Sequence, residues 1–425
     1  MQFDGKFIDG GVTAPQGFTA NGVLNKIKAS RTTNDTALIY SEKICNAAGI
    51  FTQNRVKAEC VKLTRDHIAN GKAQAVIANS GNANACTGKE GYDNAQKEAD
   101  AVAKKMNINA DDVLVLSTGV IGQQLPVEKI LNGLDTLADG LSKEGHKEAR
   151  IAIMTTDTQY KECALETTIG GKIVRMGTMA KGSGMIHINL GTMLGFITTD
   201  CAISSAMLEK ALRISAAQTY NCVSIDGDTS TNDSLVVLAN GMAGNAEITA
   251  EGADFDAFVA ALNALNAQMA KKIAADGEGA TRLVTCNVTG ADTVENARGL
   301  AKAVICSNLV KAAFFGADAN WGRILDAMGY SGYFFTPEKT SVSFVSRAGA
   351  KRYFTDGSQN GGEERKIKVF DHGVPLNFDE TLAKQILTEE AVEILVELED
   401  GSASGTAWGC DLTYDYVKIN GDYRT

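Results

Sequence analysis

Proline and tryptophan are scarce in this sequence, and its 41 basic residues are outnumbered by 51 acidic ones. Only 4 of the 425 residues are proline, 2 are tryptophan, and aromatic residues make up 6%. The formal net charge of −10 argues against a nucleic acid or an anionic membrane as partner, since both would require a basic face. No apolar run reaches transmembrane length. We therefore expect a soluble protein that binds neither nucleic acid nor membranes.

Paired cysteines and clustered histidines are also missing. The nine cysteines are scattered, odd in number and never spaced as Cys-x-x-Cys, so reduced structural thiols and a cytoplasmic location are expected. With only four histidines we predict no zinc and no other metal. Residues 1–6 show no basic start followed by an apolar core, so no secretory signal is predicted.

Small and apolar residues, in contrast, are plentiful. The chain holds 43 glycines and 44% apolar residues, a composition typical of compact globular enzymes. Its length exceeds one ordinary core, which predicts two domains. From about Thr281 the pattern changes to strand, helix, strand and predicts a second, smaller α/β domain. We place the division near Cys286, which gives domains 1–285 and 286–425.

Hydrophobic periodicity locates several elements. Helices are predicted over 92–106, 125–141 and 206–218, and another has an apolar face from Phe258 to Ile273 and ends at Asp276-Gly277. A buried strand is predicted at 74–78, and a second strand at 111–116 that leads into Ser117-Thr-Gly. The Asn- and Gly-rich loop 79–88 could expose amides to an anion, but a compact turn is favoured. The chain end is predicted as a short strand near 417–420 and a frayed polar tail.

Polar residues stand where buried segments end. Ser117-Thr118-Gly119 follows a strand and offers a hydroxyl and backbone N–H groups, which could form an oxyanion hole or an ordinary strand exit. Glu278, between two glycines after a helix, is either a solvated cap or a positioned carboxylate. The acidic loop 224–234 lacks EF-hand spacing, so we predict a hydrogen-bonded polar loop near a site and no calcium.

The segment from Lys181 to Asp200 points most directly to chemistry. After Lys181-Gly-Ser-Gly it is almost entirely apolar or hydroxylic, which predicts a buried, extended segment with Gly191-Thr192 at its middle. A Ser-His-Asp triad is poorly supported because no Gly-x-Ser-x-Gly elbow is present, and P-loop spacing is absent. A threonine can instead use its own α-amine as base, whose pKa of about 7.7–8.0 lies below the ~10.4 of lysine. Self-cleavage before Thr192 would expose that amine, and the small Gly191 favours attack on the preceding carbonyl.

Eleven short motifs, in order along the chain, resemble those of the ornithine acetyltransferase family, also called glutamate N-acetyltransferase. They include Lys181-Gly-Ser-Gly-Met-Ile, Asp226-Gly-Asp-Thr-Ser-Thr-Asn-Asp and Asp276-Gly-Glu-Gly-Ala-Thr. The others lie at residues 10–15, 54–58, 79–88, 117–122, 154–158, 192–194, 320–324 and 422–425. Each motif alone is weak, but their order over the whole length makes chance an unconvincing explanation.

The resemblance implies a fold, an assembly and a reaction. The expected fold is an αββα sandwich with an N-terminal-nucleophile site. Self-cleavage between Gly191 and Thr192 would give an α chain 1–191 and a β chain from 192, assembled as an α2β2 heterotetramer. The expected reaction, in arginine biosynthesis, is ping-pong: Thr192 takes the acetyl group from N-acetylornithine and glutamate accepts it. No cofactor is expected, and use of acetyl-CoA as a second donor stays open.

Site residues follow from the resemblance by position. Thr192 would be the nucleophile, and Thr118 and Gly119 would form the oxyanion hole. Lys181 would bind the substrate α-carboxylate and Glu278 a substrate amino group. The remaining substrate-binding residues would be Thr158, Asn420 and Thr425. This role for the tail replaces the frayed end expected from composition alone.

The sequence also departs from the family pattern and leaves alternatives. Ile188 stands where the family usually has proline, and Gly195 where it has alanine; both loosen the backbone near the cleavage site. His187 is expected to be a hydrogen-bonded structural histidine. An amidase or aminopeptidase with the same threonine would pass the acyl group to water, and a non-catalytic amino-acid-binding protein would keep one intact chain.

Overall fold

Two compact units make up the chain. The computed structural model describes residues 3–187, 193–353 and 361–422. Unit 1 comprises Met1–Gly182, Asn189–Tyr220 and Thr229–Met269, and unit 2 comprises Ser183–Ile188, Asn221–Asp228 and Ala270–Thr425. The last division falls inside a continuous helix, whereas the sequence prediction divides the chain near Cys286. Because the helix continues across this division, its hydrophobic periodicity does not change between Met269 and Ala270. Periodicity alone therefore could not locate the division.

Unit 1 is built on one mixed sheet with the strand order β1-β6-β7-β9-β11-β3-β4-β5, and β2 pairs with β3. The strands are β1 (Gly5–Ile8), β2 (Phe18–Val23), β3 (Thr36–Phe51), β4 (Lys72–Asn82), β5 (Val113–Val120), β6 (Lys161–Ile169), β7 (Lys172–Lys181), β9 (Leu194–Thr199) and β11 (Ser234–Ala239). The helices are α1 (Glu59–His67), α2 (Gly88–Met106), α3 (Val127–Asp139), α4 (His146–Ala152), α5 (Ser205–Gln218) and α6 (Ala253–Ala275), the last continuing into unit 2.

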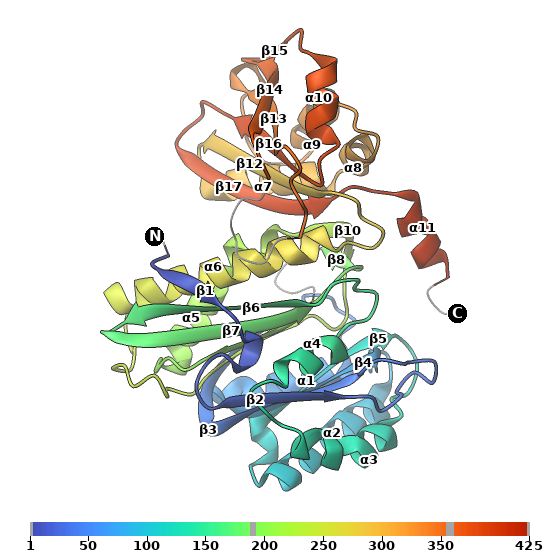
Figure 1. The fold of residues 1–425 in the computed structure, drawn as a ribbon, viewed down its shortest axis with the longest axis vertical. Coiled ribbons are helices and arrows are strands. Elements are labelled where there is room, and N and C mark those ends of the chain that lie inside the picture. Colours follow the sequence, from blue (N-terminus) through green and yellow to red (C-terminus); the bar gives the residue numbers. More distant parts are fainter. Residues whose placement is uncertain (1–2, 188–192, 354–360, 423–425) are drawn as a thin grey trace. The chain divides into compact units, whose positions relative to one another are not determined.

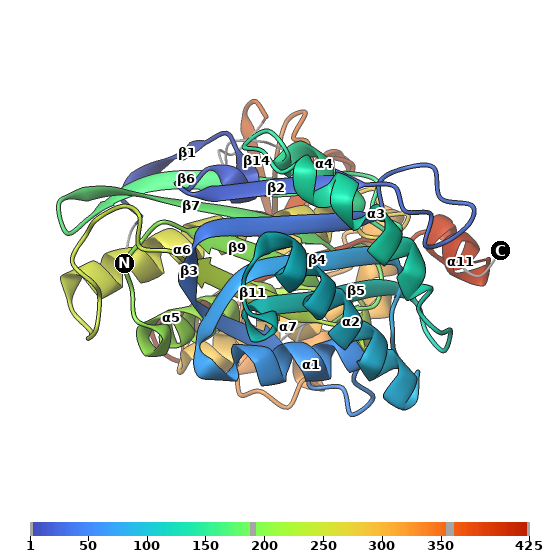
Figure 2. The same ribbon diagram turned by 90° about the horizontal axis from the view of Figure 1, so that it is seen from below.

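The sheet of unit 1 folds into two layers with helices outside them. One face of β3, β4 and β5 buries apolar residues against α1, α2 and α3, which cover these strands in Figure 2. The opposite face packs against β7, β9 and β11, with Met179, Phe196 and Val236 in the shared core. Helices α5 and α6 lie beyond that second strand layer (Figure 1). The predicted αββα sandwich is therefore confirmed.

The buried strands explain the apolar sequence runs. All six residues of β9 and all six of β11 are buried, and the two strands pair in parallel from Ser234↔Leu194 to Ala239↔Thr199. Parallel strands covered on both faces need continuous apolar runs and not alternation. This confirms a buried, extended segment for residues 194–199.

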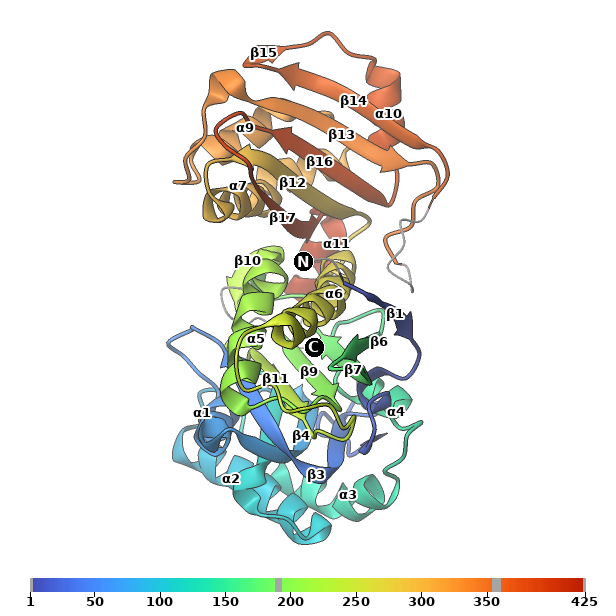
Figure 3. The ribbon, with the colours of Figure 1, turned by 90° about the vertical axis from the view of Figure 1, so that its left-hand side faces the viewer.

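Unit 2 contains a six-stranded sheet in the order β15-β14-β13-β16-β12-β17 and a small pair, β8 with β10. The strands are β8 (Ile186–His187), β10 (Ser224–Thr229), β12 (Leu283–Ala291), β13 (Ser341–Arg347), β14 (Glu364–Asp371), β15 (Val374–Pro375), β16 (Ala391–Glu397) and β17 (Ala403–Cys410). The helices are α7 (Val294–Cys306), α8 (Asn308–Phe315), α9 (Trp321–Gly329), α10 (Glu380–Leu387) and α11 (Tyr414–Gly421). Helices α7 and α10 pack on the sheet (Figure 3). The predicted α/β character of this region is confirmed.

The chain end corrects one prediction. Residues 417–420, predicted as a strand, belong to helix α11, which follows Thr413. Val417, an apolar residue of the predicted strand, is 70% exposed, and Tyr414 at the start of the helix is 84% exposed, so neither side chain enters a core. Within the described ranges no helix is long and apolar enough to cross a membrane, and all nine cysteines are free thiols.

Candidate active site

Strand β5 ends at the predicted oxyanion residues. It pairs in parallel with β4, and Thr118 and Gly119 lie opposite Ser80 and Gly81. Gly119 has φ +138°, and a Cβ there would lie 2.5 Å from the carbonyl carbon of Gly81. Both the dihedral and the close approach require glycine. Thr118 and Gly119 are half-buried. Pairing with β4 and the close approach at Gly119 fix their backbone, while their catalytic role stays a prediction.

Buried asparagine side chains donate hydrogen bonds to the residues at the end of β5 and to the loops beside it. Asn232 Nδ2 donates to the carbonyl of Ser117 at 2.7 Å and also to that of Ala83. Asn79 Nδ2 donates to Ser117 Oγ at 2.8 Å, and Asn82 Nδ2 donates to the carbonyls of the 123–124 loop. Loop 79–88 therefore uses its amides internally, as its compact-turn interpretation predicts. Sequence reasoning predicted a polar loop around residue 232 but missed Asn232 as an anchor of β5.

Lys181 belongs to a buried ionic cluster of unit 1. It is the last residue of β7 and is 8% exposed. Nearby, Asp157 Oδ1 accepts from Lys161 Nζ at 2.7 Å and from the Gly182 N–H at 2.8 Å. Asp157 Oδ2 accepts from the Thr155 N–H at 3.0 Å.

The charges of this cluster keep Asp157 ionised. Burial by itself would raise the pKa of Asp157, but the positive charges of Lys161 and Lys181 outweigh it and hold that pKa well below its usual range. The side chains of Asp157 and Lys161 are almost entirely buried, at 0% and 1% exposed. Asp157 lies within the family motif at residues 154–158, but the sequence predicted no role for it and none for Lys161. The sequence feature that could have indicated this ion pair is the spacing of four residues between Asp157 and Lys161. Thr158, which follows Asp157, is exposed, and its substrate contact stays a prediction.

In unit 2, Glu278 is held in the turn after α6. It is 6% exposed, and its N–H donates to the Ser183 carbonyl at 2.9 Å. Asn420 Nδ2, from α11, donates to Glu278 Oε2 at 2.7 Å. A Cβ at Gly184 would lie 2.4 Å from Glu278 Cδ, which explains one glycine of the Gly-Ser-Gly motif. Glu278 is thus a positioned carboxylate and not a solvated cap.

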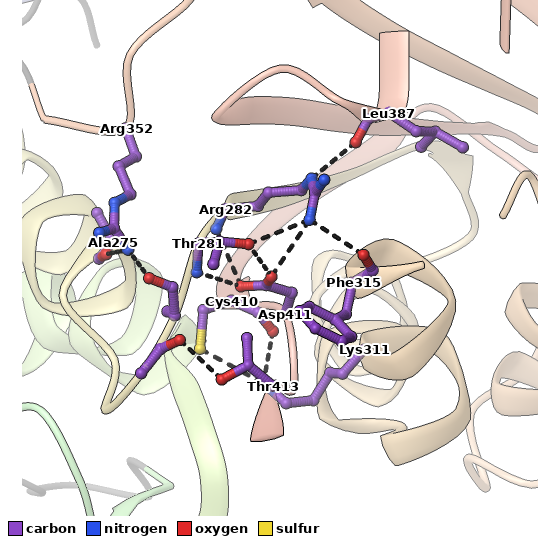
Figure 4. Close-up of polar contacts among 12 residues, drawn as sticks. Ala275, Thr281, Arg282, Lys311, Phe315, Arg352, Leu387, Cys410, Asp411 and Thr413 are labelled. Atoms are coloured by element: carbon purple, nitrogen blue, oxygen red, sulfur yellow. Dashed lines mark hydrogen bonds and ion pairs between the residues drawn. The ribbon is translucent and has the colours of Figure 1, made fainter. Parts of the chain in front are cut away.

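A buried ion pair follows this turn (Figure 4). Asp411 Oδ1 accepts from the N–H groups of Thr281 at 2.8 Å and of Arg282 at 2.9 Å. Asp411 Oδ2 accepts from the Thr281 hydroxyl and from Arg282 Nη1. The guanidinium of Arg282 also donates to the carbonyls of Leu387 and Phe315. We name this group the Asp411 clamp.

Residues next to Asp411 extend the clamp to the Glu278 turn and to α11. Thr413 Oγ1 donates to the Gly279 carbonyl at 2.8 Å. The buried Lys311 donates to the Cys410 carbonyl at 2.5 Å, as Figure 4 shows. The clamp therefore joins the turn that carries Glu278 to the segment that leads into the helix of Asn420.

His187, also in unit 2, is hydrogen-bonded. Its Nδ1 lies 3.1 Å from Ser224 Oγ and 3.6 Å from Cys306 Sγ. Burial and the nearby charge of Lys302 lower its pKa, against an opposing contribution from Asp228. These contacts agree with a structural histidine.

Three predicted residues lie outside the part of the chain that the structure describes. They are Gly191 and Thr192 of the cleavage site and Thr425 of the tail. Among the residues that it does describe, no group of three or more metal-ligating side chains comes together.

The fold and the site residues of unit 1 indicate a class of protein. An αββα sandwich whose strands end at a Thr-Gly pair and at a buried lysine fits the N-terminal-nucleophile enzymes that the sequence resembles. The particular family is shown by comparison with known proteins. The ArgJ family model matches residues 19–425, and the chain belongs to this family, which confirms the resemblance inferred from the eleven motifs.

Relatives of the chain match it over nearly its full length. It is 48% identical over 420 residues to an arginine biosynthesis bifunctional protein ArgJ of Caldanaerobacter subterraneus, covering 99% of this chain and 100% of that protein. A protein of the same name from Thermotoga neapolitana is 45% identical, covering 97% of this chain and 99% of that protein.

Two crystal structures are also similar. The arginine biosynthesis bifunctional protein of Bacillus halodurans is 41% identical with a TM-score of 0.47, covering 53% of this chain and 97% of that one. Ornithine acetyltransferase of Mycobacterium tuberculosis, in complex with ornithine, is 42% identical with a TM-score of 0.41, covering 43% of this chain and 97% of that one.

Proposed function

We propose that this chain is a glutamate N-acetyltransferase of arginine biosynthesis. It moves the acetyl group of N2-acetyl-L-ornithine to L-glutamate. Membership of the ArgJ family over residues 19–425 is the observation that carries this proposal, together with the names of full-length relatives in arginine biosynthesis.

The reaction begins with a covalent step on Thr192, after self-cleavage between Gly191 and Thr192. The α-amine of Thr192 takes the hydroxyl proton as Oγ attacks the acetyl carbonyl. The C–N bond then breaks, the proton passes to the leaving amine, and ornithine departs. An acetyl ester remains on Thr192.

The second half reverses these steps with another amine. The amino group of glutamate attacks the ester carbonyl, the bond to Thr192 Oγ breaks, and N-acetylglutamate leaves. In both halves Thr118 and Gly119 donate hydrogen bonds to the developing oxyanion. The rigid glycine geometry at the end of β5 supports this role, because preorganised donors are the effective ones.

Substrate binding uses one buried charge of each sign. Lys181 binds the α-carboxylate and Glu278 an amino group, with Thr158, Asn420 and Thr425 as further contacts. Both charged residues are under 10% exposed. An amino-acid substrate carries a carboxylate and an amino group, so each of its charges is opposite in sign to one of these two residues.

Further properties follow from the same assignment. The α chain 1–191 and the β chain from Thr192 assemble as an α2β2 heterotetramer in the cytoplasm. Acetyl-CoA serves as a second acetyl donor, which the word bifunctional in the relatives' names supports. No resident cofactor takes part.

Transfer of a labelled acetyl group tests the proposal. Wild-type enzyme is incubated with [14C]acetyl-ornithine, with and without glutamate, and the products are separated. We expect labelled N-acetylglutamate that appears only when glutamate is present. Labelled acetate formed at the same rate with or without glutamate would instead identify an amidase, and tight binding without turnover would identify a binding protein.

A further inference from the structure

A polar pocket of unit 1 lies where helices α1 and α5 meet the end of strand β3. Its volume is about 290 Å³, close to the lower limit of about 300 Å³ for pockets that hold small ligands. Residues 49–53 form one wall, and the charged side chains that line it are Lys57, Arg65 and Arg213. All three are basic, and within the described part of the chain no acidic residue lines the pocket. This positive lining stands out in a chain with a net charge of −10.

Two of these three cations have no carboxylate partner among the described residues. Arg65 is exposed and makes no hydrogen bond or ion pair with any of them. Lys57 Nζ donates to the carbonyl of Asn54 at 2.8 Å. Arg213 pairs with Glu209 at 2.7 Å on the surface of α5. Like charges around one pocket repel one another, and an anion bound between them relieves this repulsion.

The donors of the pocket fit the oxygens of a phosphate group. The planar guanidinium of arginine binds phosphate through two parallel N–H groups, and lysine binds it as a point charge. The exposed carboxamide of Gln53 adds a neutral donor. A phosphate monoester carries a charge of about −1.5 to −2 at pH 7, which matches two uncompensated cations better than a single carboxylate does.

The pocket lies on the sheet row that contains the start of β9. Phe51, in the pocket wall, lies opposite Ser234 of β11, and Ser234 lies opposite Leu194 of β9. Adjacent strands are about 4.8 Å apart, so Phe51 is roughly 10 Å along the sheet from Leu194. Leu194 is two residues after Thr192 in the sequence. A ligand in the pocket is therefore near the strand that follows the proposed nucleophile, but not in contact with that strand.

We propose that this pocket binds phosphate groups, and that its ligand is the phosphate-bearing end of coenzyme A when acetyl-CoA is the acetyl donor. The inference rests on the proposed function, in which acetyl-CoA is a second donor. The pantetheine arm separates the thioester of acetyl-CoA from its phosphates, so such a donor requires a phosphate site away from the reacting threonine. N-acetylornithine carries no phosphate and does not use the pocket.

Equilibrium binding without turnover tests the proposal. The whole protein is titrated calorimetrically, under reducing conditions, with coenzyme A, with pantetheine, which lacks the phosphates, and with inorganic phosphate. In Arg65→Gln we expect the Kd for coenzyme A to rise roughly tenfold or more, because a charged hydrogen-bond donor is lost. The Kd for pantetheine should stay within about twofold of the wild-type value. The affinity of wild type for coenzyme A should also fall as salt is added.

Arg55→Gln is the matched control. Arg55 is an exposed arginine two residues before Lys57 and does not line the pocket, so its loss should leave the Kd for coenzyme A within about twofold of wild type. Equal effects of the two substitutions, or no binding of coenzyme A and phosphate by wild type, would overturn the proposal. Inorganic phosphate that binds as tightly as coenzyme A, and more weakly to Arg65→Gln, would support the anion site and overturn coenzyme A as its ligand.

A separate assay keeps the two proposals distinct. Wild-type enzyme that does not transfer acetyl groups from N-acetylornithine to glutamate would contradict the proposed function. The titrations require no turnover, so their outcome decides the role of the pocket alone.

Discussion

The two units hold their candidate site residues by different means. In unit 1, Thr118 and Gly119 lie near the end of β5 and Lys181 is the last residue of β7, and ladders of backbone hydrogen bonds place them. In unit 2, Glu278 lies in a turn and Asn420 in the short helix α11. The side chains of Asn420 and of Thr413, which extends the Asp411 clamp, connect the two segments. A backbone ladder holds a strand through hydrogen bonds from many residues, whereas the position of the Glu278 turn depends on a few side chains. Unit 2 should therefore be the more sensitive to the loss of a single buried side chain away from the site.

The largest expected effect is a loss of kcat when a substitution displaces the backbone at the end of β5 in unit 1. Gly119→Ala puts a Cβ 2.5 Å from the Gly81 carbonyl carbon at a φ of +138°, so the end of β5 must move. Displacing an oxyanion donor costs roughly 10²–10³ in kcat, measured by steady-state acetyl transfer. Gly122→Ala is the control, because it also has a positive φ but meets nothing within 4 Å. Equal kcat losses in the two variants would show that strain alone, and not contact with β4, is responsible.

The next largest expected effect is a loss of stability when the Asp411 clamp of unit 2 is disrupted. Asp411→Asn leaves Arg282 without its charge partner, and both side chains are largely buried, at 0% and 14% exposed. Breaking a buried pair costs about 3–5 kcal/mol, so thermal unfolding should begin at a temperature lower by roughly 10 °C. Lys351→Met removes the exposed pair with Glu390 and should leave the unfolding temperature nearly unchanged, because exposed ion pairs contribute little to stability. Similar losses in both variants would contradict the distinction between a clamp and a surface pair.

The buried acid Glu98 of unit 1 makes the stability of the protein depend on pH. Burial raises the pKa of Glu98, on α2, from 4.5 to about 8. Between these values only the unfolded chain releases the proton, so the free energy of unfolding falls as pH rises, by about 1.4 kcal/mol per unit at most. Below pH 4.5 and above about pH 8 this contribution no longer changes.

Glu98→Gln should remove that pH dependence. The stability of the variant relative to wild type should rise by about 3 kcal/mol between pH 5 and pH 7.5, as measured by denaturant unfolding of the whole protein. Glu90→Gln changes an exposed residue of the same helix and is the control. A difference between Glu98→Gln and wild type that stays constant with pH would mean that Glu98 is ionised in the folded protein.

The smallest effect concerns the amide that anchors β5. Asn232→Ala leaves two buried carbonyl groups, those of Ser117 and Ala83, without this donor. Each lost buried partner costs about 1–3 kcal/mol, but the ladder to β4 still holds the strand. We expect kcat to fall roughly tenfold, less than in Gly119→Ala. A loss as large as that of Gly119→Ala would mean that side chains, and not the ladder, place the end of β5.

Sequence patterns revealed unit 1 better than unit 2. Buried strands and the glycine at 119 leave local patterns, so β4, β5 and the segment 194–199 could be predicted. The partners that support the site could not be, because Arg282 and Asp411 lie 129 residues apart and Asn232 lies 115 residues from Ser117. Helix α11 was mistaken for a strand because its Val417 and Ile419 follow an alternating pattern, although the helix is mostly exposed.

The mass of the denatured protein, before and after brief exposure to N-acetylornithine, tests the central claim most directly. The account predicts two fragments that meet at Gly191 and Thr192, and one acetyl group gained by the C-terminal fragment. A single intact chain that never gains an acetyl group, in a sample shown to be folded, would contradict it. Thr192 would then not be an N-terminal nucleophile in this protein.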